Sequence, residues 1–493
     1  MSAHLPTIDK GRSRTYVDQL IGHFHETILS GRLGPGDRLP TIRAVAEHTD
    51  ITRTTVQEAY RRLAQAGLVS ATVGRGTVVL GEPGSSRMRP FSAAAQAAWH
   101  HFREAPQAPQ APSDASTVIN FAQLQPDPRQ FPVDEFRRCI EAAMRDRGGD
   151  LLEYGQAGGL PELRRRLAAR EAPQQEPLSL DEILITNGAQ QGIDLALRTF
   201  TESGDAIAVT IPTYQHLFGL LRVHGLEIIP ISEDENGIDL ADLRRVLTHP
   251  RVRLIYAMPS FHNPTGRSLG VGQREALTQA VSETDIPILE DEFEHELRFA
   301  GEDLPTLRSF DGRGLTVTAR TFSKGLFPGV RIGWLRAEPK IIERMAALKC
   351  YSDLETSPLL QAALANFMDS GSYDGHLSKL REELRHRHRA AQVALKEHMP
   401  EGFRWSEPSG GHVLWVEGPN SIDDDAWAAL AAKRGILVTP GRVFDPFARL
   451  RHGIRLSLSA VSTEQIHHGI EMIGQCASEL LARPLPSRRP LFL

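Results

Sequence analysis

The chain has 493 residues, of which 41% are hydrophobic and 24% are charged. This composition is typical of soluble globular proteins and excludes disordered, collagen-like and coiled-coil chains. At roughly 100 to 200 residues per domain, the length predicts two or three domains. The net charge of −5 argues against a protein that coats nucleic acid through bulk positive charge, so we expect any DNA contact to be local.

Three cysteines, Cys139, Cys350 and Cys476, lie far apart without a CxxC spacing. This pattern favours neither a disulfide framework nor a thiolate zinc site, and we expect no metal. The segment from Met1 to Gly11 has no apolar core of a signal peptide, and the chain has no run of about 18 apolar residues that would span a membrane. We therefore expect a soluble protein in a reducing cytoplasm, without a membrane partner.

Residues 81–117 separate a small amino-terminal part from a large remainder. They are rich in Gly, Pro and Ala, which is typical of a semi-rigid linker, with a short helix around Trp99 and Phe102. Residues 1–80 carry a balance of +3, against −8 for the rest of the chain, which predicts an anionic partner for the head alone. The predicted organisation is a head at 12–80, the linker at 81–117, a body at 118–480 and a tail at 481–493.

The head shows the pattern of three helices followed by a hairpin. Apolar residues recur at helical spacing between Tyr16 and Ile28 and predict the first helix. Thr41 and Thr52 are N-cap residues that open two further helices joined by a tight turn. Two β-rich runs within 68–80 flank the glycines of 74–76 and predict a hairpin. This order predicts a winged helix-turn-helix.

Three segments of the head carry a resemblance to a known family. They are Leu39-Pro40-Thr41-Ile42-Arg43, Thr52-Arg53-Thr54-Thr55-Val56 and Gly74-Arg75-Gly76-Thr77. Over residues 14–80 the chain resembles the winged helix-turn-helix of GntR-type bacterial transcription regulators. One departure is the turn between the helices, where relatives usually have a glycine and this chain has Thr49-Asp50. The resemblance implies binding to double-stranded operator DNA.

The same resemblance gives the head residues their expected roles. Arg53, Thr54 and Thr55 follow the cap Thr52 on the first turn of the recognition helix, from which side chains reach base edges and phosphates in the major groove. Two further arginines are expected to contact DNA, Arg43 at the backbone or a base and Arg75 in the minor groove. The alternative is that these are solvated arginines on a three-helix interaction module.

The body alternates short β-rich runs with helical stretches, which predicts an α/β domain with a largely parallel sheet flanked by helices. The predicted strands are 183–185, 206–209, 227–229, 254–257, 287–289 and 316–318. Ligands bind at the carboxyl ends of the strands in such sheets. A glycine turn at 186–192, an acidic segment at 290–293 and a lysine-containing segment at 321–334 each follow one of these runs. Phosphate-binding backbone, carboxylate and lysine are therefore expected at one edge.

This ordered set of motifs over residues 118–480 resembles the class I aminotransferases, which are pyridoxal 5′-phosphate (PLP) enzymes of fold type I. The resemblance implies that Lys324 forms the Schiff base, Asp291 pairs with the pyridinium nitrogen, Asn263 donates to the phenolic oxygen and Tyr214 stacks on the ring. It implies a phosphate site formed by Ala189, Gln190, Thr321, Ser323 and Arg331, and a substrate or effector carboxylate bound by Arg455. Tyr154 is expected to reach the phosphate of a partner subunit. Taken singly, each of these residues has an ordinary structural explanation.

One position departs from the pattern of the relatives. They usually have a tyrosine two residues after the aspartate, and this chain has Phe293. The loss of that hydroxyl removes a hydrogen-bond donor to the phenolic oxygen and changes the electron sink. It suggests a site under weaker demand for turnover.

A GntR-like head joined to an aminotransferase-like body resembles the MocR (GabR-type) transcription regulators. The resemblance implies a bacterial, cytoplasmic, head-to-tail homodimer that associates with the nucleoid when bound to DNA. In that reading an amino compound forms an external aldimine in place of Lys324, and the change is passed to the heads. Two alternatives stay open, namely an active class I aminotransferase with a DNA-binding head and a regulator that senses the cofactor itself. The sequence does not identify the amine, the operator, or activation against repression.

Overall fold

The computed structural model describes residues 5–8, 15–29, 32–34, 36–72, 76–80, 92–104, 108–110, 118–172, 178–234, 237–447 and 449–482. The chain divides into two compact units, Met1–Phe91 and Ser92–Leu493. None of the three cysteines is in a disulfide bond. Within the described ranges, every helix is too short or too polar to cross a membrane.

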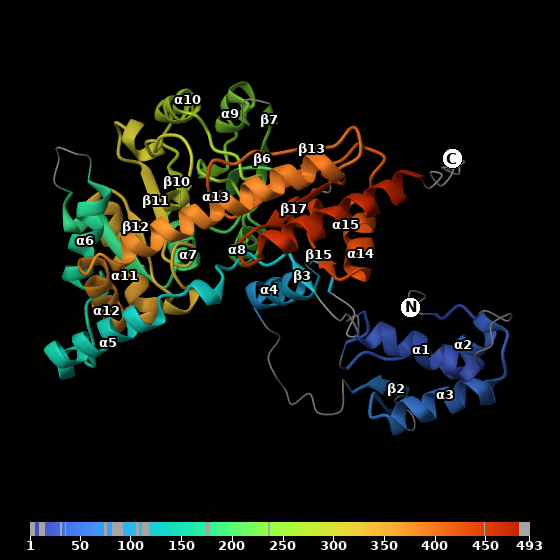
Figure 1. Cartoon of the computed structure of the whole chain (residues 1–493). Helices are drawn as coiled ribbons and strands as arrows, with labels where there is room; N and C mark the ends of the chain where they lie inside the picture. The colour runs from blue at the N-terminus through green and yellow to red at the C-terminus, as the bar shows by residue number, and fades with distance from the viewer. Residues whose placement is uncertain are drawn as a thin grey trace. The chain divides into compact units, whose positions relative to one another are not determined.

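The first unit has the predicted helices and hairpin (Figure 1). Its elements are α1 (Tyr16–Leu29), α2 (Ile42–Thr49), α3 (Arg53–Gln65) and the antiparallel strands β1 (Val69–Thr72) and β2 (Gly76–Val79). Both predicted caps are confirmed, because Thr41 accepts a hydrogen bond from the Ala44 amide and Thr52 accepts one from the Thr55 amide. Asp50 in the turn between α2 and α3 adopts a left-handed conformation with φ of 55°, which Asp tolerates better than most side chains.

The core of the first unit is built from all three helices and both strands. Phe24 of α1 packs edge-on against Tyr60 of α3, with the ring centroids 5.4 Å apart. Leu20, Val56 and Leu63 are fully buried beside them. The Tyr60 hydroxyl donates to the Pro40 carbonyl at 2.7 Å and so ties α3 to the segment before α2. These contacts hold the first turn of α3 at the surface.

The second unit is an α/β fold whose described residues form a seven-stranded sheet in the order β4-β12-β11-β10-β9-β5-β6. The strands are β4 (Ile183–Thr186), β12 (Gly333–Arg336), β11 (Thr316–Thr321), β10 (Ile288–Asp291), β9 (Val252–Ala257), β5 (Ala206–Thr210) and β6 (Glu227–Ile231). Adjacent strands are parallel except at β12, which runs antiparallel to β4 and β11. All six predicted strands and the largely parallel sheet are confirmed.

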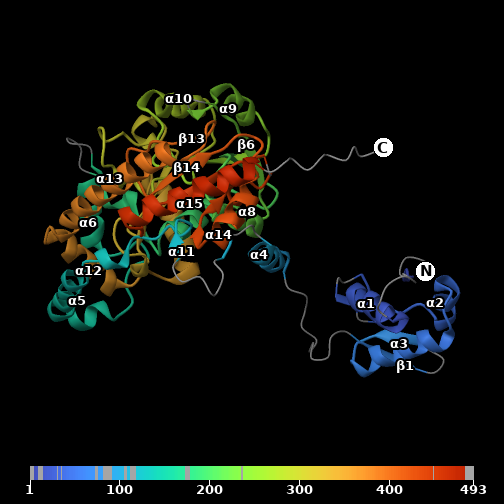
Figure 2. The ribbon, with the colours of Figure 1, turned by 45° about the vertical axis from the view of Figure 1, so that its right-hand side comes forward.

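Helices cover both faces of this sheet (Figure 2). On one face, α7 (Ala189–Phe200), α8 (Gln215–His224) and α11 (Pro339–Asp353) share a core with the alternate residues Ile207 and Val209 of β5. On the other face, Ala206 and Ala208 pack with α9 (Leu240–Leu247) and α10 (Val271–Ser282). The period-two alternation along β5 thus serves two cores. Further along that second face lie α6 (Pro161–Glu171) and α12 (Pro358–Asp369), against which α5 (Val133–Arg147) packs.

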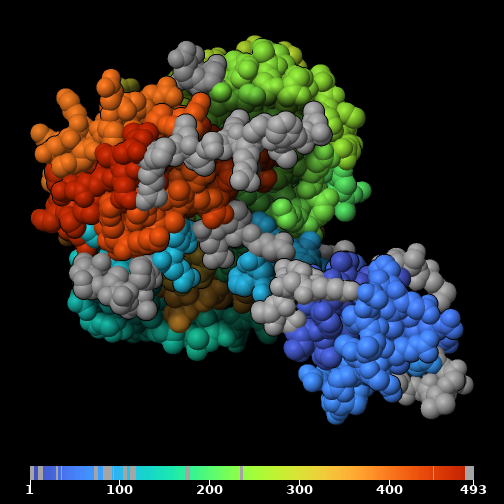
Figure 3. Space-filling view, turned by 90° about the vertical axis from the view of Figure 1, so that its right-hand side faces the viewer, coloured from blue at the N-terminus to red at the C-terminus, as the bar shows by residue number. Residues whose placement is uncertain are grey.

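A carboxy-terminal lobe completes the second unit. It contains the sheet β13-β14-β17-β16 and the helices α14 (Asp424–Lys433) and α15 (Thr463–Ala482). The strands are β13 (Arg404–Trp405), β14 (Val413–Glu417), β17 (Gly453–Ser457) and β16 (Thr439–Pro440), and β15 (Ile436–Leu437) pairs with β3 (Ile119–Asn120). The long helix α13 (Ser372–His398) places Leu380 and Leu384 in the core beside the large sheet and Ala391 and Leu395 in the core of the lobe. Figure 3 shows this lobe, in orange and red, beside green segments of the large lobe.

Part of the predicted linker is folded onto the second unit. The helix α4 (Ala93–Glu104) packs against α8, as expected for a short helix around Trp99 and Phe102. A Cβ atom on Gly219 of α8 would lie 2.9 Å from the His101 ring, so the missing side chain is what allows the two helices to come this close.

We expect the two units to have separate stabilities. Phe24→Ala empties a fully buried site in the first unit and should destabilise it by about 3–5 kcal/mol. Hydrogen exchange followed by mass spectrometry should then show faster exchange in α1 to α3 and unchanged exchange in the large sheet. Phe121→Ala, at an equally buried site in the carboxy-terminal lobe, is the reciprocal control. Loss of protection in both units of the Phe24 variant would contradict the separation.

Candidate functional site

Strand ends and loops of the large sheet surround a cavity of about 280 Å³. Ten of the eleven body residues predicted from the sequence line it, namely Ala189, Gln190, Tyr214, Asn263, Asp291, Thr321, Ser323, Lys324, Arg331 and Arg455. Asp291 is the last residue of β10 and Thr321 the last residue of β11, so the carboxyl edge of the sheet forms the floor. Arg455 comes from β17 and brings the carboxy-terminal lobe to the same cavity.

Lys324 lies in the turn after β11 and extends its amine into the cavity. Its Nζ donates to the Leu124 carbonyl at 2.8 Å. Burial lowers the pKa of Lys324, while the carboxylate of Glu294 opposes that shift. A lowered pKa increases the fraction of neutral amine, which is the form that attacks a carbonyl carbon.

The two carboxylate oxygens of Asp291 differ in their hydrogen bonding. Its Oδ2 accepts a hydrogen bond from the Tyr256 hydroxyl at 2.6 Å, whereas its buried Oδ1 has no hydrogen-bond partner among the described residues. Burial raises the pKa of Asp291 to about 7, and the Tyr256 hydrogen bond opposes the shift. An N–H donor aimed at Oδ1, above all a cationic one, would satisfy this oxygen.

The end of the cavity beside α7 has the features of a phosphate site. The amino terminus of α7 follows Gly188, whose φ of 81° is left-handed. A Cβ atom at this position would lie 2.7 Å from the Arg331 guanidinium, so glycine lets Arg331 approach the turn. Arg331 Nη2 donates to the Asn187 carbonyl at 3.2 Å. The hydroxyls of Thr321 and Ser323 are 3.0 Å apart beside it.

Arg455 is fixed at the other end of the cavity. Its Nη1 donates to Asn263 Oδ1 at 3.1 Å and its Nη2 to Thr439 Oγ1 at 3.2 Å. Within the described part of the chain, its buried Nε has no hydrogen-bond partner. Burial lowers the pKa of Arg455 to about 10, so the group stays cationic at neutral pH. A buried guanidinium with a donor to spare is suited to a carboxylate.

These residues fit pyridoxal 5′-phosphate. The orphaned oxygen of Asp291 matches a ring N–H, the Gly188 turn with Arg331 matches a phosphate, and the buried Lys324 amine matches an aldehyde. The Tyr214 ring lines the cavity, and its hydroxyl donates to Gln190 Oε1 at 3.0 Å. When bound, the cofactor supplies an aldehyde that condenses with primary amines and a ring that accepts electrons.

Four groups at or beside the site were not found from the sequence. Tyr256 on β9 is a diagonal neighbour of Asp291 on β10, because the register pairs it with Leu289; a tyrosine near a strand end was the available signal. The Leu124 carbonyl carried no signal in its side chain. Glu294 and His412 are fully buried and joined by a hydrogen bond of 2.6 Å. Their positions in the sequence are far apart, so only the fold reveals the pair.

Of two further residues discussed from the sequence, Phe293 lines the cavity and Tyr154 lies outside it. Phe293 lines the cavity and brings no hydroxyl to it. Tyr154 does not line the cavity, and its side chain is 86% exposed. It is therefore available for a contact outside its own subunit.

The first unit presents its predicted DNA contacts at the surface. Arg53 and Thr54 are exposed on the first turn of α3, and the Thr52 hydroxyl lies 2.8 Å from those of Thr54 and Thr55. Arg43 is also exposed, but its Nε donates to Glu47 at 2.7 Å, so it must exchange this partner to reach DNA. Arg75 lies outside the described residues.

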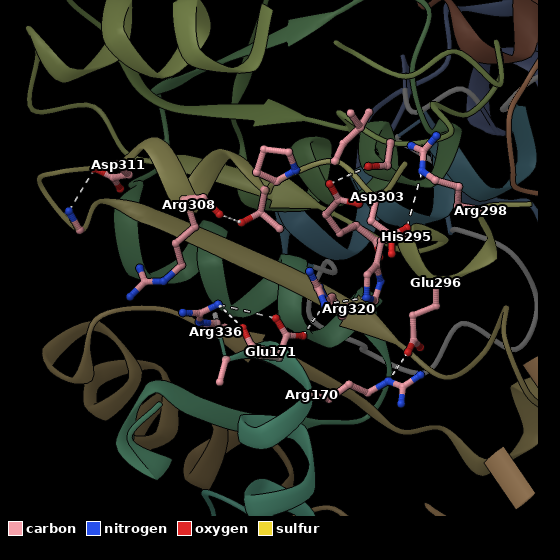
Figure 4. A pocket seen from close by; sticks show the side chains of 18 of the residues that line it. Arg170, Glu171, His295, Glu296, Arg298, Asp303, Arg308, Asp311, Arg320 and Arg336 are labelled. Atoms are coloured by element: carbon pink, nitrogen blue, oxygen red, sulfur yellow. Dashed lines mark hydrogen bonds and ion pairs between the residues drawn. The ribbon is translucent and has the colours of Figure 1, made fainter. Parts of the chain in front are cut away.

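A second cavity of about 740 Å³ lies on the opposite face of the sheet. Arg320 and Glu292 line it, whereas their chain neighbours Thr321 and Asp291 face the first cavity, as strand alternation requires. Figure 4 shows its arginines paired with acids, with Arg320 Nη1 donating to Glu171 at 2.5 Å. The charged groups of this wall are therefore paired with one another.

Both units match known families. The model of aminotransferase class I and II matches residues 116–473, and the model of bacterial regulatory proteins of the gntR family matches residues 17–79. These matches define a transcription regulator in which a GntR helix-turn-helix is joined to an aminotransferase fold.

One relative matches nearly the whole chain, and others match about three quarters of it. The HTH-type transcriptional regulator TauR from Rhodobacter capsulatus is 31% identical over 465 residues, which are 91% of this chain and 94% of TauR. Aromatic-amino-acid aminotransferase 1 from Thermococcus litoralis is 31% identical over 372 residues, 74% of this chain and 89% of the relative. The crystal structure of the alpha-aminoadipate aminotransferase LysN from Thermus thermophilus, complexed with N-(5′-phosphopyridoxyl)-L-leucine, matches with a TM-score of 0.72 and 28% identity over 80% of this chain and 98% of LysN. The chain belongs to the MocR-type transcription regulators.

The environment of Asp291 predicts a pH-dependent stability of cofactor-free protein. The pKa of Asp291 is raised to about 7 from about 3.9 in an unfolded chain, so the fold binds a proton that the unfolded chain has lost. Stability should therefore fall as the pH rises from about 4 to about 7, by roughly 1–3 kcal/mol from this residue. Asp291→Asn should flatten that part of the profile and weaken PLP binding. Urea unfolding across this pH range measures the difference, and an unchanged slope in the variant would contradict the assignment.

Proposed function

We propose that this regulator binds PLP at Lys324 and senses an amino compound that competes with the Lys324 amine for the cofactor. The observation that carries the proposal is the convergence on one cavity of a buried lysine, an aspartate with an unpartnered oxygen and a buried arginine with an unpartnered Nε. A cofactor with an aldehyde and a ring N–H would bind the lysine and the aspartate, and the carboxylate of an amino acid would bind the arginine. The same chain carries the DNA-binding unit.

The proposed roles of the cavity residues follow from their contacts. Asp291 would bind the ring nitrogen of the cofactor and keep that nitrogen protonated. Arg331 and the Gly188 turn would bind the phosphate. Lys324 holds the cofactor until an amine replaces it, and its lowered pKa favours release as a neutral group. Arg455 binds the carboxylate of the effector. LysN, which is similar in fold, was crystallised with a phosphopyridoxyl amino acid, and this supports the same pair of ligands here.

The proposal includes a head-to-tail homodimer. Tyr154 has a largely exposed ring outside its own cavity, which supports a contact with the phosphate site of a partner subunit. Because α4 packs on α8 of the second unit, the chain that connects a head to this unit is residues 81–91, and 11 extended residues at ~3.1 Å each would span roughly 34 Å.

Lys324→Ala tests the sensing step. We expect the variant to keep its DNA affinity within about twofold but to lose the change in DNA binding that the effector causes, because the amine exchange has been removed. Fluorescence anisotropy with labelled operator DNA and visible absorption spectra provide the two measurements. Lys340→Ala, at an exposed lysine of α11, is the matched control. An intact response to amines in the Lys324 variant would show that the exchange mechanism is wrong.

The visible spectrum during titration of the PLP-loaded protein also separates the alternatives. A stable spectral shift with an amino compound supports a sensor and identifies its signal class. Conversion to the pyridoxamine form, reversed by a keto acid, would make the body a transaminase. A DNA affinity that depends on PLP alone would indicate a sensor of the cofactor.

Arg53→Ala tests the recognition helix. A side chain that contacts a base edge contributes about 1–3 kcal/mol to discrimination, so we expect operator binding to weaken by roughly tenfold or more. Duplexes selected from a random pool with the wild-type protein serve as the DNA. The control is Arg61→Ala, on the same helix, whose guanidinium is paired with Glu58 at 2.6 Å. Equal losses in the two variants would indicate a general charge effect and contradict a base contact by Arg53.

A further inference from the structure

A third cavity adjoins the proposed PLP site. It measures about 380 Å³ and lies between α4 and α8. Four residues, Ala122, Gln215, His216 and Arg455, line both this cavity and the PLP cavity. A ligand whose carboxylate binds Arg455 can therefore extend into either space. The cavity between α4 and α8 is named the distal cavity below.

Each helix turns one face to the distal cavity. Ala98, His101 and Phe102 of α4 line it, and their spacing of three and four residues places them on the same side of the helix. On α8, the opposite wall is lined by Gln215, Phe218, Gly219 and Val223, which follow one another along one side of the helix at spacings of three and four residues from Gln215 and of four from Gly219. The helices meet where the His101 ring lies over Gly219.

The lining of the distal cavity is mainly apolar. Seven of its residues have apolar side chains, namely Ala98, Phe102, Ala108, Ala122, Phe218, Val223 and Val443. Burial lowers the pKa of His101 and of His216, so both rings are neutral at neutral pH. Arg455 is then the charged residue of the lining, and its guanidinium is assigned to the α-carboxylate of the effector. An acidic effector side chain would lose its hydration among these apolar groups, whereas an aliphatic or aromatic one would bury apolar surface. Phe102 is 72% exposed and has apolar surface left to bury.

We propose that the effector is an α-amino acid with an aliphatic or aromatic side chain, which enters the distal cavity and is covered by α4. The proposal rests on the proposed function, because Arg455 and the PLP cavity fix the α-carbon end of the ligand. It assigns α4 a binding role that the linker position did not suggest. Since α4 begins next to the boundary of the DNA-binding unit, the effector touches the segment that joins the two units.

The test compares four amino acids on full-length, PLP-loaded protein. L-alanine, L-leucine, L-phenylalanine and L-aspartate are titrated, with visible absorption and the fluorescence of Trp99 as independent readouts. Trp99 lies on α4, is 56% exposed and stacks near Phe102, and Trp99→Phe shows which part of the signal it supplies. We expect leucine or phenylalanine to bind at least about tenfold more tightly than alanine, and aspartate to bind no more tightly than alanine.

Two variants test whether α4 forms the wall. Gly219→Leu places a side chain where the His101 ring lies and should reduce the preference for leucine over alanine to about twofold or less. Gly375→Leu, at a helical glycine of α13 with open space around it, is the matched control. Phe102→Ala should weaken phenylalanine binding by roughly fivefold. Because Phe102 is exposed, its removal leaves no cavity in the core and should not unfold the protein.

The outcomes separate this proposal from the one on which it rests. Equal affinity for all four amino acids, tightest binding of aspartate, or the same effect from Gly219→Leu and Gly375→Leu would overturn the distal subsite. A preference for leucine seen by Trp99 fluorescence without a change in absorption would support the subsite and refute amine exchange at Lys324. No response in either readout would overturn both.

Discussion

The burial of Asp291 at the end of β10 is the constraint on which the site depends. A carboxylate without solvent is costly, and its single hydrogen bond from Tyr256 offsets only part of that cost. The neighbouring strand β9 places Tyr256 opposite Leu289, two residues before Asp291, so its hydroxyl reaches the carboxylate. An unpartnered carboxylate oxygen of this kind favours the binding of a cationic ring N–H. The stability of the body and its affinity for the cofactor are therefore linked through one residue.

The buried charges around the cavity include both acids and bases, which stabilise one another electrostatically. Glu294 is buried and paired with His412. Its carboxylate raises the pKa of Lys324 and of Arg455, and so opposes the lowering of both pKa values by burial. Lys324 also donates to a backbone carbonyl, so the site can hold a lysine in either protonation state. Nearby opposite charges matter here because Asp291, Glu294 and Arg455 are all buried, and a buried charge without a partner is costly. The carboxy-terminal lobe is thus part of the site through Arg455 and through His412.

The sequence was sufficient for six of the seven strands described in the large sheet and for the ten residues found to line the cavity, because each of these lies within a few residues of a recognisable run or turn. The antiparallel strand β12 was not predicted. Thr41 and Thr52 could be assigned as caps for the same reason, since an N-cap hydrogen bond is local. Tyr256, Glu294 and the Leu124 carbonyl could not be found, because their roles depend on strand register and on contacts between segments far apart in the chain. The docking of α4 on α8 depends on Gly219 and His101, a pair that no local pattern connects. Apart from β12, the features that the sequence left open are contacts between distant segments of the chain.

The fixed geometry of Arg455 bears on how a sensor of this design discriminates among amines. Asn263 and Thr439 hold two guanidinium nitrogens in place and leave Nε without a partner. A pre-oriented cation loses little conformational freedom when a carboxylate binds, so the binding energy is retained as affinity. A simple amine lacks the carboxylate and leaves this buried cation without an anion, which is a penalty and not merely a missing contact. The contact with Asn263 couples the carboxylate anchor to the residue predicted to face the cofactor's phenolic oxygen. Occupancy of Arg455 can therefore alter the polar environment of the cofactor as well as the position of the effector.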